Sequence, residues 1–347
     1  AEELDPTLAG DRRVRALLIV AGNPVLSMPA GDRIGRGLAG LDFMVAVDLY
    51  LNETTRHADV ILPPVPQLEH DNFDFLAQST GVRNCVRPSE LVLEPEPGGR
   101  RSWEVFLELA ARWNGAKPED FDDAMLLANA TRFAGRLGLD ADAVADEVRR
   151  ANPRGPMRLV DLQLRCGPYG DHFGARPDGL TFAKLRDAGG VIDLGPLEPR
   201  LPDILRTPGR RIALADPLVT GDVARLRARQ AELEADASLR LVGRRQTRNM
   251  NSWLHNSELF AKGRPRCTLL MHPADARADG APLRVTSRVG EVVAPLEISD
   301  EMMPGVVSLP HGFGQTTNGT RTSVAAAQQP GANANALTDP GPLDAPS

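Results

Sequence analysis

Residues 239–256, LRLVGRRQTRNMNSWLHN, contain side chains suited to holding an anionic or heterocyclic ligand. A short apolar run predicts a strand, and Gly243 follows it, where the missing Cβ lets backbone approach a ligand closely. The guanidinium fork of arginine matches phosphate oxygens, and side-chain amides can pair with the edge of a heterocycle. The candidate binding residues after this glycine are Arg244, Arg245, Asn249, Asn251, Ser252, Trp253, His255 and Asn256.

The charge of this region points the same way. Between residues 240 and 270, seven basic residues stand against Glu258 alone, in a chain whose net charge is −6. A local reversal of sign indicates an anionic ligand. A solvated basic turn would give the same pattern, so the region by itself leaves both interpretations open.

The whole chain has the composition of a globular protein, with 347 residues, 42% of them hydrophobic and 25% charged. This length predicts two domains. The aromatic content of 4% and the negative net charge argue against a nucleic-acid-binding protein. No apolar run is long enough for a membrane span. The chain begins at Ala1 without Met, so we expect a fragment of a longer protein.

The cysteines are Cys85, Cys166 and Cys267, which lie far apart and form no CxxC motif. Such spacing is typical of a reducing compartment and predicts neither a disulfide framework nor a structural zinc site. We therefore expect a cytoplasmic protein.

The N-terminal region predicts a doubly wound α/β fold. Three apolar runs, at residues 15–21, 43–47 and 58–62, predict buried strands of a parallel sheet, with a helix at residues 32–41. Strand, crossover and strand, repeated within about fifty residues, are typical of this topology.

Ligands of such sheets bind beyond the carboxyl ends of the strands. Asn23 and Asp48 follow the first two predicted strands, and His70 follows the third after a short connection. Asn-Pro and Asp are also common turn formers, which leaves a turn or cap role open for Asn23 and Asp48. No GxGxxG follows the first strand, which argues against a simple Rossmann-type nucleotide enzyme.

The middle of the chain predicts helices. An amphipathic helix is expected at residues 102–114, with Trp103 and Trp113 on its core face. Thr181 is a plausible N-cap. The other predicted segments are helices at residues 120–152 (with a break near 135–140), 159–165 and 181–188, and a Pro-rich ordered connector at 193–209.

The C-terminal region predicts a small barrel because short strands alternate with turns. A surface helix is expected at residues 222–233, and His311 and Gly312 form a turn after the last strand. From Gln315 onward the composition predicts a disordered tail, which a ligand or a second chain would have to order. The predicted strands are residues 211–215, 239–242, 267–271, 283–287, 291–298 and 306–309.

Three stretches, in this order, resemble the molybdopterin oxidoreductases of the dimethyl sulfoxide reductase family. The first is ALLIVAGNPVLSMP, followed by DFMVAVDLYLNETTRHADVILPPVPQLEHDN. The second is LVGRRQTRNMNSWLHN. The third comprises MHPADA, VTSRVGEVVAPLEISDEMMPGVVSLPHGFG and GANANALTDPGPLDAPS. The resemblance covers nearly all of this chain, but only the C-terminal portion of the family's chain.

The resemblance implies an α/β doubly wound domain followed by a β-rich double-psi β-barrel domain. The first would be a partial molybdopterin oxidoreductase domain with a helical insertion, residues 1–208, and the second the dinucleotide-binding domain, residues 209–347. The family's iron–sulfur ligation and the side chain that ligates its metal belong to an N-terminal part that this chain does not match. We therefore expect no catalytic residue and no metal ligand in this chain.

The implied cofactor is molybdenum bis(molybdopterin guanine dinucleotide). Two family positions differ here, because Val242 stands where relatives have Thr, and His70 lies near a position that is often Lys. The cofactor-binding residues that the resemblance implies are Asn23, Asp48, His70, Gly243, Arg244, Arg245, Asn249, Asn251, Ser252, Trp253, His255, Asn256, His311, Gly312 and Asn335.

The implied function is the C-terminal cofactor-binding part of an oxidoreductase acting on a small substrate such as formate, nitrate or a sulfoxide. The chain alone would be inactive, and its partners would be the N-terminal remainder and an electron-transfer subunit. The alternative is a cofactor-free structural or interaction module, related to the respiratory complex I subunit of the same fold. The two differ in whether residues 244–256 line an open cleft or pack against protein.

Overall fold

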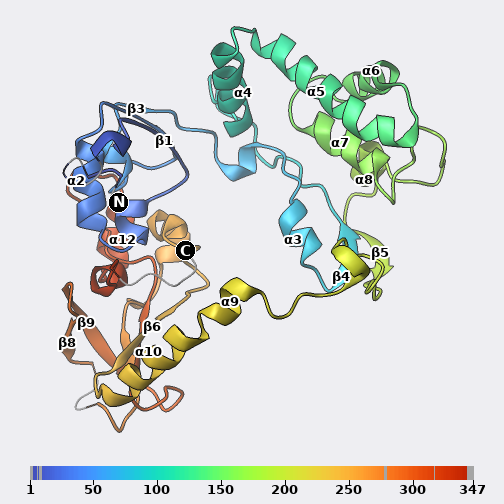
Figure 1. Ribbon diagram of the computed structural model, residues 1–347. Coiled ribbons are helices and arrows are strands. Elements are labelled where there is room, and N and C mark those ends of the chain that lie inside the picture. Colours follow the sequence, from blue (N-terminus) through green and yellow to red (C-terminus); the bar gives the residue numbers. More distant parts are fainter. Residues whose placement is uncertain (1–2, 6, 8–9, 277–279, 316, 342–347) are drawn as a thin grey trace. The chain divides into compact units, whose positions relative to one another are not determined.

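The structure is a computed structural model that describes residues 3–5, 7, 10–276, 280–315 and 317–341 (Figure 1). The chain forms two compact units. Unit 1 combines Ala1–Leu62 with Arg211–Ser347, and unit 2 is Pro63–Arg210. The predicted domain boundary at residues 208/209 lies beside the junction at Arg210. The compact units nevertheless separate residues 63–208 from the N-terminal sheet, which packs with the C-terminal region.

Unit 1 begins with a three-stranded parallel sheet in the order β1-β2-β3, as the α/β pattern predicts. Alternate side chains along β1 face helix α2. Leu17 and Ile19 thereby contact the core around Ile34. The elements are β1 (Ala16–Val20), α1 (Pro24–Ser27), α2 (Gly31–Ala39), β2 (Phe43–Val47) and β3 (Val60–Ile61).

The expectation that the first run is a buried strand is wrong for one face of β1. The side chains of Leu18 and Val20 are 50% and 47% exposed. Along a strand, successive side chains point to opposite faces, and the described residues of unit 1 place α2 against the face that holds Leu17 and Ile19.

The second sheet of unit 1 has five strands in the order β6-β10-β7-β9-β8. It is mixed, because β10 pairs parallel with β6 and antiparallel with β7. Leu269, Leu296 and Leu309 form its core. Five of the six predicted strands are confirmed as β6 (Arg240–Arg244), β7 (Leu269–Met271), β8 (Pro282–Thr286), β9 (Glu291–Ile298) and β10 (Val306–Pro310).

The predicted strand at residues 211–215 is wrong. The segment has no strand partner among the described residues, and Leu214 is 91% exposed, so its alternating apolar side chains have no surface to cover. It leads into α9 (Pro217–Gly221) and α10 (Val223–Ala235). Helix α10 buries none of its side chains, which confirms the predicted surface helix.

The C-terminal segment is ordered over its described residues, so the prediction of a disordered tail is wrong there. It contains α12 (Ser323–Gln328) and a 3-10 helix, η7 (Ala334–Leu337). Polar contacts within the chain replace the missing apolar periodicity. The side-chain carbonyl of Asn256 accepts hydrogen bonds from the first turn of α12, and the side-chain amide of Gln329 donates to the carbonyl of Ala261 at 2.7 Å.

Unit 2 is mainly helical, as predicted, with a break between Ala134 and Ala141. Its antiparallel strand pair β4–β5 was not predicted. Trp113 is 92% exposed, against expectation, because α4 buries Val105 and Ala111 instead. The elements are α3 (Phe75–Ser79), β4 (Arg83–Val86), α4 (Ser102–Trp113), α5 (Pro118–Ala134), α6 (Ala141–Ala151), α7 (Met157–Cys166), α8 (Phe182–Asp187) and β5 (Ile192–Pro196).

Short helical turns complete the chain, and Thr181 caps α8 by accepting a hydrogen bond from the backbone of Lys184. None of the helices in the described part of the chain is long and apolar enough to cross a membrane. The remaining turns are η1 (Gly10–Arg12), η2 (Thr55–His57), η3 (Gln67–Glu69), η4 (Gly135–Leu137), η5 (Pro208–Arg210), η6 (Trp253–Asn256) and α11 (Glu258–Ala261).

Candidate functional site

The loop after strand β2 holds its polar side chains by hydrogen bonds to its own backbone. Asp48 accepts from the backbone N–H of Tyr50 at 3.0 Å and from the side-chain amide of Asn52 at 3.3 Å. Asn52 in turn accepts from the N–H groups of Thr54 and Thr55, each at 2.9 Å. A buried loop needs such partners for its polar groups, and here they fix the directions of Asp48 and Asn52.

Asn23 links the end of strand β1 to this loop. Its amide nitrogen donates to Glu53 Oε2 at 2.8 Å, and its carbonyl accepts from the Thr54 hydroxyl at 2.7 Å. Thr54 also accepts from the backbone N–H of Val25 at 3.1 Å. The carboxyl ends of β1 and β2 therefore present one connected polar surface, as expected for adjacent parallel strands.

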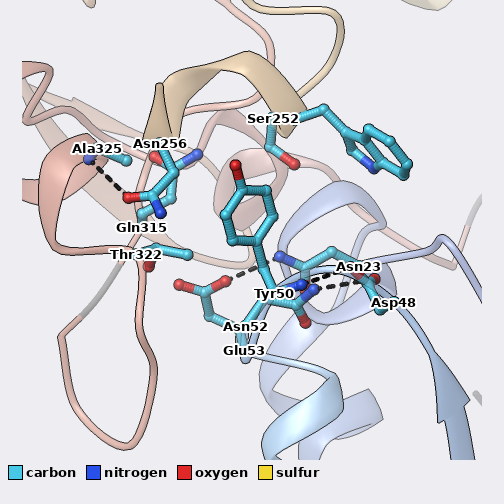
Figure 2. A pocket seen from close by; sticks show the side chains of 11 residues that line it. Asn23, Asp48, Tyr50, Asn52, Glu53, Ser252, Asn256, Gln315, Thr322 and Ala325 are labelled. Atoms are coloured by element: carbon cyan, nitrogen blue, oxygen red, sulfur yellow. Dashed lines mark hydrogen bonds between the residues drawn. The ribbon is translucent and has the colours of Figure 1, made fainter. Parts of the chain in front are cut away.

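A pocket of unit 1 lies where this surface meets the C-terminal region (Figure 2). In the close view, the ring of Tyr50 stands between the side chains of Asn23 and Glu53 and those of Ser252 and Asn256. The enclosed space measures about 20 Å³, which accommodates about one water molecule. The lining residues are Asn23, Asp48, Tyr50, Asn52, Glu53, Ser252, Trp253, Asn256, Gln315, Thr322 and Ala325.

The polar segment after β6 supplies the second wall. Trp253–Asn256 form a 3-10 turn, in which Asn256 uses its side-chain carbonyl to cap α12 and its amide to donate to Arg321 at 3.3 Å. The same residue therefore lines the pocket and holds in place the helix that contributes Ala325 to it.

His255 lies fully buried behind this wall. Its ring packs on Phe313 with the centroids 4.4 Å apart, and its Nδ1 is 3.0 Å from Gln315 Nε2. An amide nitrogen can only donate, so Nδ1 accepts and Nε2 carries the proton. Burial and, secondarily, the charge of Arg266 lower the pKa of His255 to about 4, so the ring is neutral near pH 7.

Three buried polar atoms near this wall have no hydrogen-bond partner among the described residues. They are Asn249 Oδ1, His255 Nε2 and Gln315 Oε1. Gln315 lines the pocket and also donates to the carbonyl of Gly312 at 2.7 Å. Buried polar atoms without partners are costly, so this cluster is suited to meeting polar groups of a ligand or ordered water.

The carboxyl of Asp48 is buried and surrounded by hydrogen-bond donors. Burial raises the pKa of its carboxyl above the ordinary value, while the N–H groups of Tyr50 and Leu49 and the amide of Asn52 oppose the shift. The carboxyl is an acceptor held in a fixed direction. It can therefore accept hydrogen bonds from N–H groups or hydroxyls of a ligand.

The structure brings part of the predicted set together. The predicted residues that line the pocket come from two regions far apart in sequence, namely Asn23, Asp48, Ser252, Trp253 and Asn256. His255 and Gly312 do not line the pocket, but both contact Gln315, which does. Asn335 donates to the carbonyl of Leu26, the residue after Val25 in helix α1, at 2.9 Å.

Other predicted residues lie elsewhere. Gly243 is inside β6 rather than at its end, and a Cβ there would meet nothing within 4 Å, so the argument from close backbone approach does not apply. Arg244 donates to the carbonyls of Ser308 and Thr268, and Arg245 bonds Asn251. Neither arginine lines this pocket. Three predicted positions remain. The buried Asn249 donates to the backbone carbonyl of His311, and neither of these two residues lines the pocket. His70 belongs to unit 2.

Six lining residues were not predicted: Tyr50, Asn52, Glu53, Gln315, Thr322 and Ala325. The first three lie within five positions after Asp48, in the loop that follows a predicted strand, and this location was a signal in the sequence. The others lie in the segment whose composition predicts disorder, and no pattern in it marked them. In the described part of the chain, no group of three or more His, Cys, Asp and Glu side chains could hold a metal ion.

The chain is similar to known proteins over this region and beyond it. Residues 239–345 match the family model described as "Molydopterin dinucleotide binding domain". The chain is 30% identical to the assimilatory nitrate reductase catalytic subunit of Bacillus subtilis over 196 residues, which are 55% of this chain and 25% of that protein. It is 24% identical to the probable oxidoreductase YoaE of the same organism over 310 residues, covering 86% of this chain and 39% of that protein.

The fold also matches a solved structure. Acetylene hydratase from Pelobacter acetylenicus superposes with a TM-score of 0.57 at 16% identity, covering 91% of this chain and 40% of that one. The chain thus spans about a quarter to two fifths of the length of these proteins. The matched domain and these relatives, which include proteins named nitrate reductase, formate dehydrogenase and thiosulfate reductase, show that the chain is similar to the molybdopterin oxidoreductases of the dimethyl sulfoxide reductase family.

Proposed function

We propose that this chain binds molybdenum bis(molybdopterin guanine dinucleotide) as part of a larger oxidoreductase. The observation that carries the proposal is the pocket, where Asn23 and Asp48 meet Ser252 and Asn256 of the matched dinucleotide-binding domain. Amide and carboxyl groups of this kind suit the N–H and carbonyl edges of a guanine and the hydroxyls of a ribose. The unpartnered Gln315 Oε1 beside them is a further acceptor.

The residues fit the cofactor by their chemistry. Asn23 and Asp48 would hold the dinucleotide half, and Asn249–Asn256 with His311 and Gly312 would lie along the pterin and phosphates. Asn335 would close over the group. Because the space measures about 20 Å³, entry of a base edge requires side chains such as Tyr50 to move aside.

The same assignment extends to His70, Gly243, Arg244 and Arg245 as predictions from the family resemblance. His70 belongs to unit 2, and its assignment comes from the family resemblance alone. The guanidinium of Arg244 is occupied by backbone carbonyls, which favours a structural role for that residue.

The reaction of the whole protein would be oxidation or reduction of a small substrate such as formate, nitrate or a sulfoxide. The bound metal group supplies the redox chemistry. This chain's residues bind and orient that group and keep His255 neutral behind it. Because the chain matches only part of its relatives, the partners we propose are the remaining N-terminal part and an electron-transfer subunit.

We further propose that the mixed sheet β6-β10-β7-β9-β8 is the core of a double-psi β-barrel, with a domain boundary near residues 208/209. The crossed order of its strands, with parallel pairs β6–β10 and β7–β9, supports this assignment. The three cysteines Cys85, Cys166 and Cys267 are free thiols, which suits the cytoplasmic location we propose.

A cofactor-free interaction module is the competing function. It would be favoured if the whole segment 244–256 packed against protein. Ser252, Trp253 and Asn256 instead line a pocket, although Asn249 and His255 are buried. The pocket and the unpartnered atoms beside it favour the cofactor-binding function.

The test is to purify the chain from a host that makes the dinucleotide cofactor, and then measure the GMP and oxidised pterin released by acid. We expect bound cofactor in the wild type and at least a tenfold loss in Asn23→Ala and Asp48→Ala, since each removes buried hydrogen bonds. Arg284→Gln, an exposed arginine of β8, is the control and should retain the cofactor. Absence of both GMP and pterin from folded wild-type protein would contradict the proposal.

A further inference from the structure

A second pocket of unit 1 shares no lining residue with the first. Its volume is about 400 Å³, which is within the range of about 300–1,000 Å³ common for small-molecule sites. Its walls come from the loop after β6, the segment 262–266 before β7, and the facing strands β7 and β9. These are the arginine-rich parts of the region that the charge pattern singled out.

The charge of this pocket is strongly positive. Five cations line it, against Glu297 as the carboxylate of the lining: Arg244, Arg248, Lys262, Arg264 and Arg266. Glu297 accepts a hydrogen bond from the Thr268 hydroxyl at 2.6 Å and lies 3.7 Å from Arg264. Glu297 also acts on the partly buried guanidinium of Arg244, but it forms no ion pair with Arg248 or Arg266 among the described residues.

Two guanidinium groups converge without a counter-charge. Arg248 and Arg266 both donate to the carbonyl of Lys262, at 3.4 and 3.2 Å. Throughout the described ranges, no carboxylate forms an ion pair with either of them. Arg266 Nε is buried with no hydrogen-bond partner, so one N–H of its fork is available to an acceptor. Like charges held together in this way repel, and an anion between them would remove the penalty.

The backbone fixes this arrangement. Arg266 also donates to the carbonyl of Phe260 at 3.0 Å, and Gln329 accepts from the backbone N–H of Arg266 at 3.1 Å. Burial, and then the charge of Arg248, lower the pKa of Arg266 below the ordinary value for arginine. The guanidinium therefore stays charged while its surroundings disfavour that charge, which makes a bound anion stabilising.

We propose that this basic pocket, centred on Arg248 and Arg266, binds an oxyanion of the phosphate type at a site separate from the pocket of Asn23 and Asp48. Planar guanidinium forks match the oxygens of phosphate groups in pairs, and Lys262 adds a point charge at the rim. The proposed ligand is a free anion of this type, distinct from the cofactor of the proposed function.

The experiment measures binding of inorganic pyrophosphate to the purified 347-residue chain by isothermal titration calorimetry, in 150 mM chloride. We expect saturable one-site binding that weakens at least tenfold in Arg248→Gln, since hydrogen bonds to charged groups are worth about that much. Arg248 makes one long hydrogen bond, so this variant should fold normally. Arg266→Lys keeps the charge, loses the fork and should weaken binding less than tenfold.

Two controls locate the site. Arg284→Gln removes an equal charge from an exposed position beside Glu291 and should bind pyrophosphate as the wild type does. Asn23→Ala, in the other pocket, should also leave pyrophosphate binding unchanged even if it abolishes cofactor binding. This result would separate the present proposal from the proposed function. The proposal is wrong if wild-type binding does not saturate, or if either control weakens it as much as Arg248→Gln does.

The source of the phosphate group follows from the cofactor-loaded protein. If Arg248→Gln retains cofactor, and pyrophosphate still binds to the loaded wild type, the site holds a free anion. If Arg248→Gln loses cofactor, and the loaded wild type no longer binds pyrophosphate, the site holds the pyrophosphate of the cofactor. The first result supports the separate anion site. The second result, or unchanged pyrophosphate affinity in Arg248→Gln, overturns it.

Discussion

The side-chain amide of Asn335 donates a hydrogen bond to the backbone carbonyl of Leu26, across 309 positions of sequence and at a distance of 2.9 Å. Leu26 belongs to helix α1, which begins at Pro24 directly after Asn23, so the C-terminal segment is tied to the region that follows strand β1. This contact holds together two regions that both line, or directly support, the candidate cofactor site.

We expect Asn335→Ala to loosen the C-terminal segment. Loss of one hydrogen bond leaves the Leu26 carbonyl without that donor and should lower the free energy of unfolding by about 1 kcal/mol. Hydrogen exchange should become faster in residues 333–338, while unit 2 keeps its exchange rates. Unchanged exchange in this segment would show that other contacts hold it in place.

Asn256→Ala should destabilise helix α12. The side-chain carbonyl of Asn256 accepts from the backbone N–H groups of Val324 and Ala325, at 3.1 and 3.3 Å, and so replaces a cap that the helix's own N-terminal residue does not supply. Removing a capping side chain costs about 0.5–2 kcal/mol. Hydrogen exchange at these two amides measures the effect. The matched variant is Asn256→Asp, which keeps an acceptor and should protect them.

The stability of unit 1 should depend on pH through His255. Its folded pKa of about 4 lies below the unfolded value of 6.5, so the unfolded chain binds more protons between these two values. This residue therefore makes the free energy of unfolding fall as the pH is lowered from about 6.5 to about 4, by at most about 1.4 kcal/mol per pH unit. Below pH 4 its contribution no longer changes.

Urea unfolding at several pH values tests this dependence. His255→Gln should have a shallower slope between pH 6.5 and 4 than the wild type, because the titrating ring is gone. His70→Gln, in unit 2, is the control and should keep the steep slope. Equal slopes in the wild type and His255→Gln would mean that the ring titrates normally in the folded protein.

Gly312→Ala should be among the most damaging small substitutions in unit 1. The backbone φ of Gly312 is +89°, and an added Cβ would lie 1.8 Å from the carbonyl oxygen of Asn251. Left-handed strain and overlap with a backbone atom together predict a loss of about 2–5 kcal/mol. Because Gln315 bonds the Gly312 carbonyl, cofactor content should fall as well.

Gly319→Ala is the matched control for this substitution. Its φ is +69°, but the nearest atom to an added Cβ is Arg56 Cδ at 3.7 Å. It should therefore cost about 1 kcal/mol, from left-handed strain alone. Thermal unfolding of both variants separates the two effects, and equal losses would contradict the predicted overlap at Gly312.

Much of this protein was determined by local sequence. Apolar runs bounded by turn residues predicted β1, β2, β9 and β10 within one or two positions, because period and turn chemistry act over short distances. The same reasoning placed Asn23 and Asp48 at adjacent strand ends, and their shared pocket follows from parallel pairing of β1 with β2.

The tertiary structure decided what depends on contacts between distant residues. A polar tail without apolar periodicity is ordered because Asn256 and Gln329 supply its hydrogen bonds, and a sequence pattern cannot show such partners. The basic, amide-rich segment gave one signal, yet Ser252, Trp253 and Asn256 line one pocket. Arg244, Gln246 and Arg248 line another. Side chains close in sequence on an irregular loop point in different directions, and only packing against β7, β9 and α12 determines which cavity each one reaches.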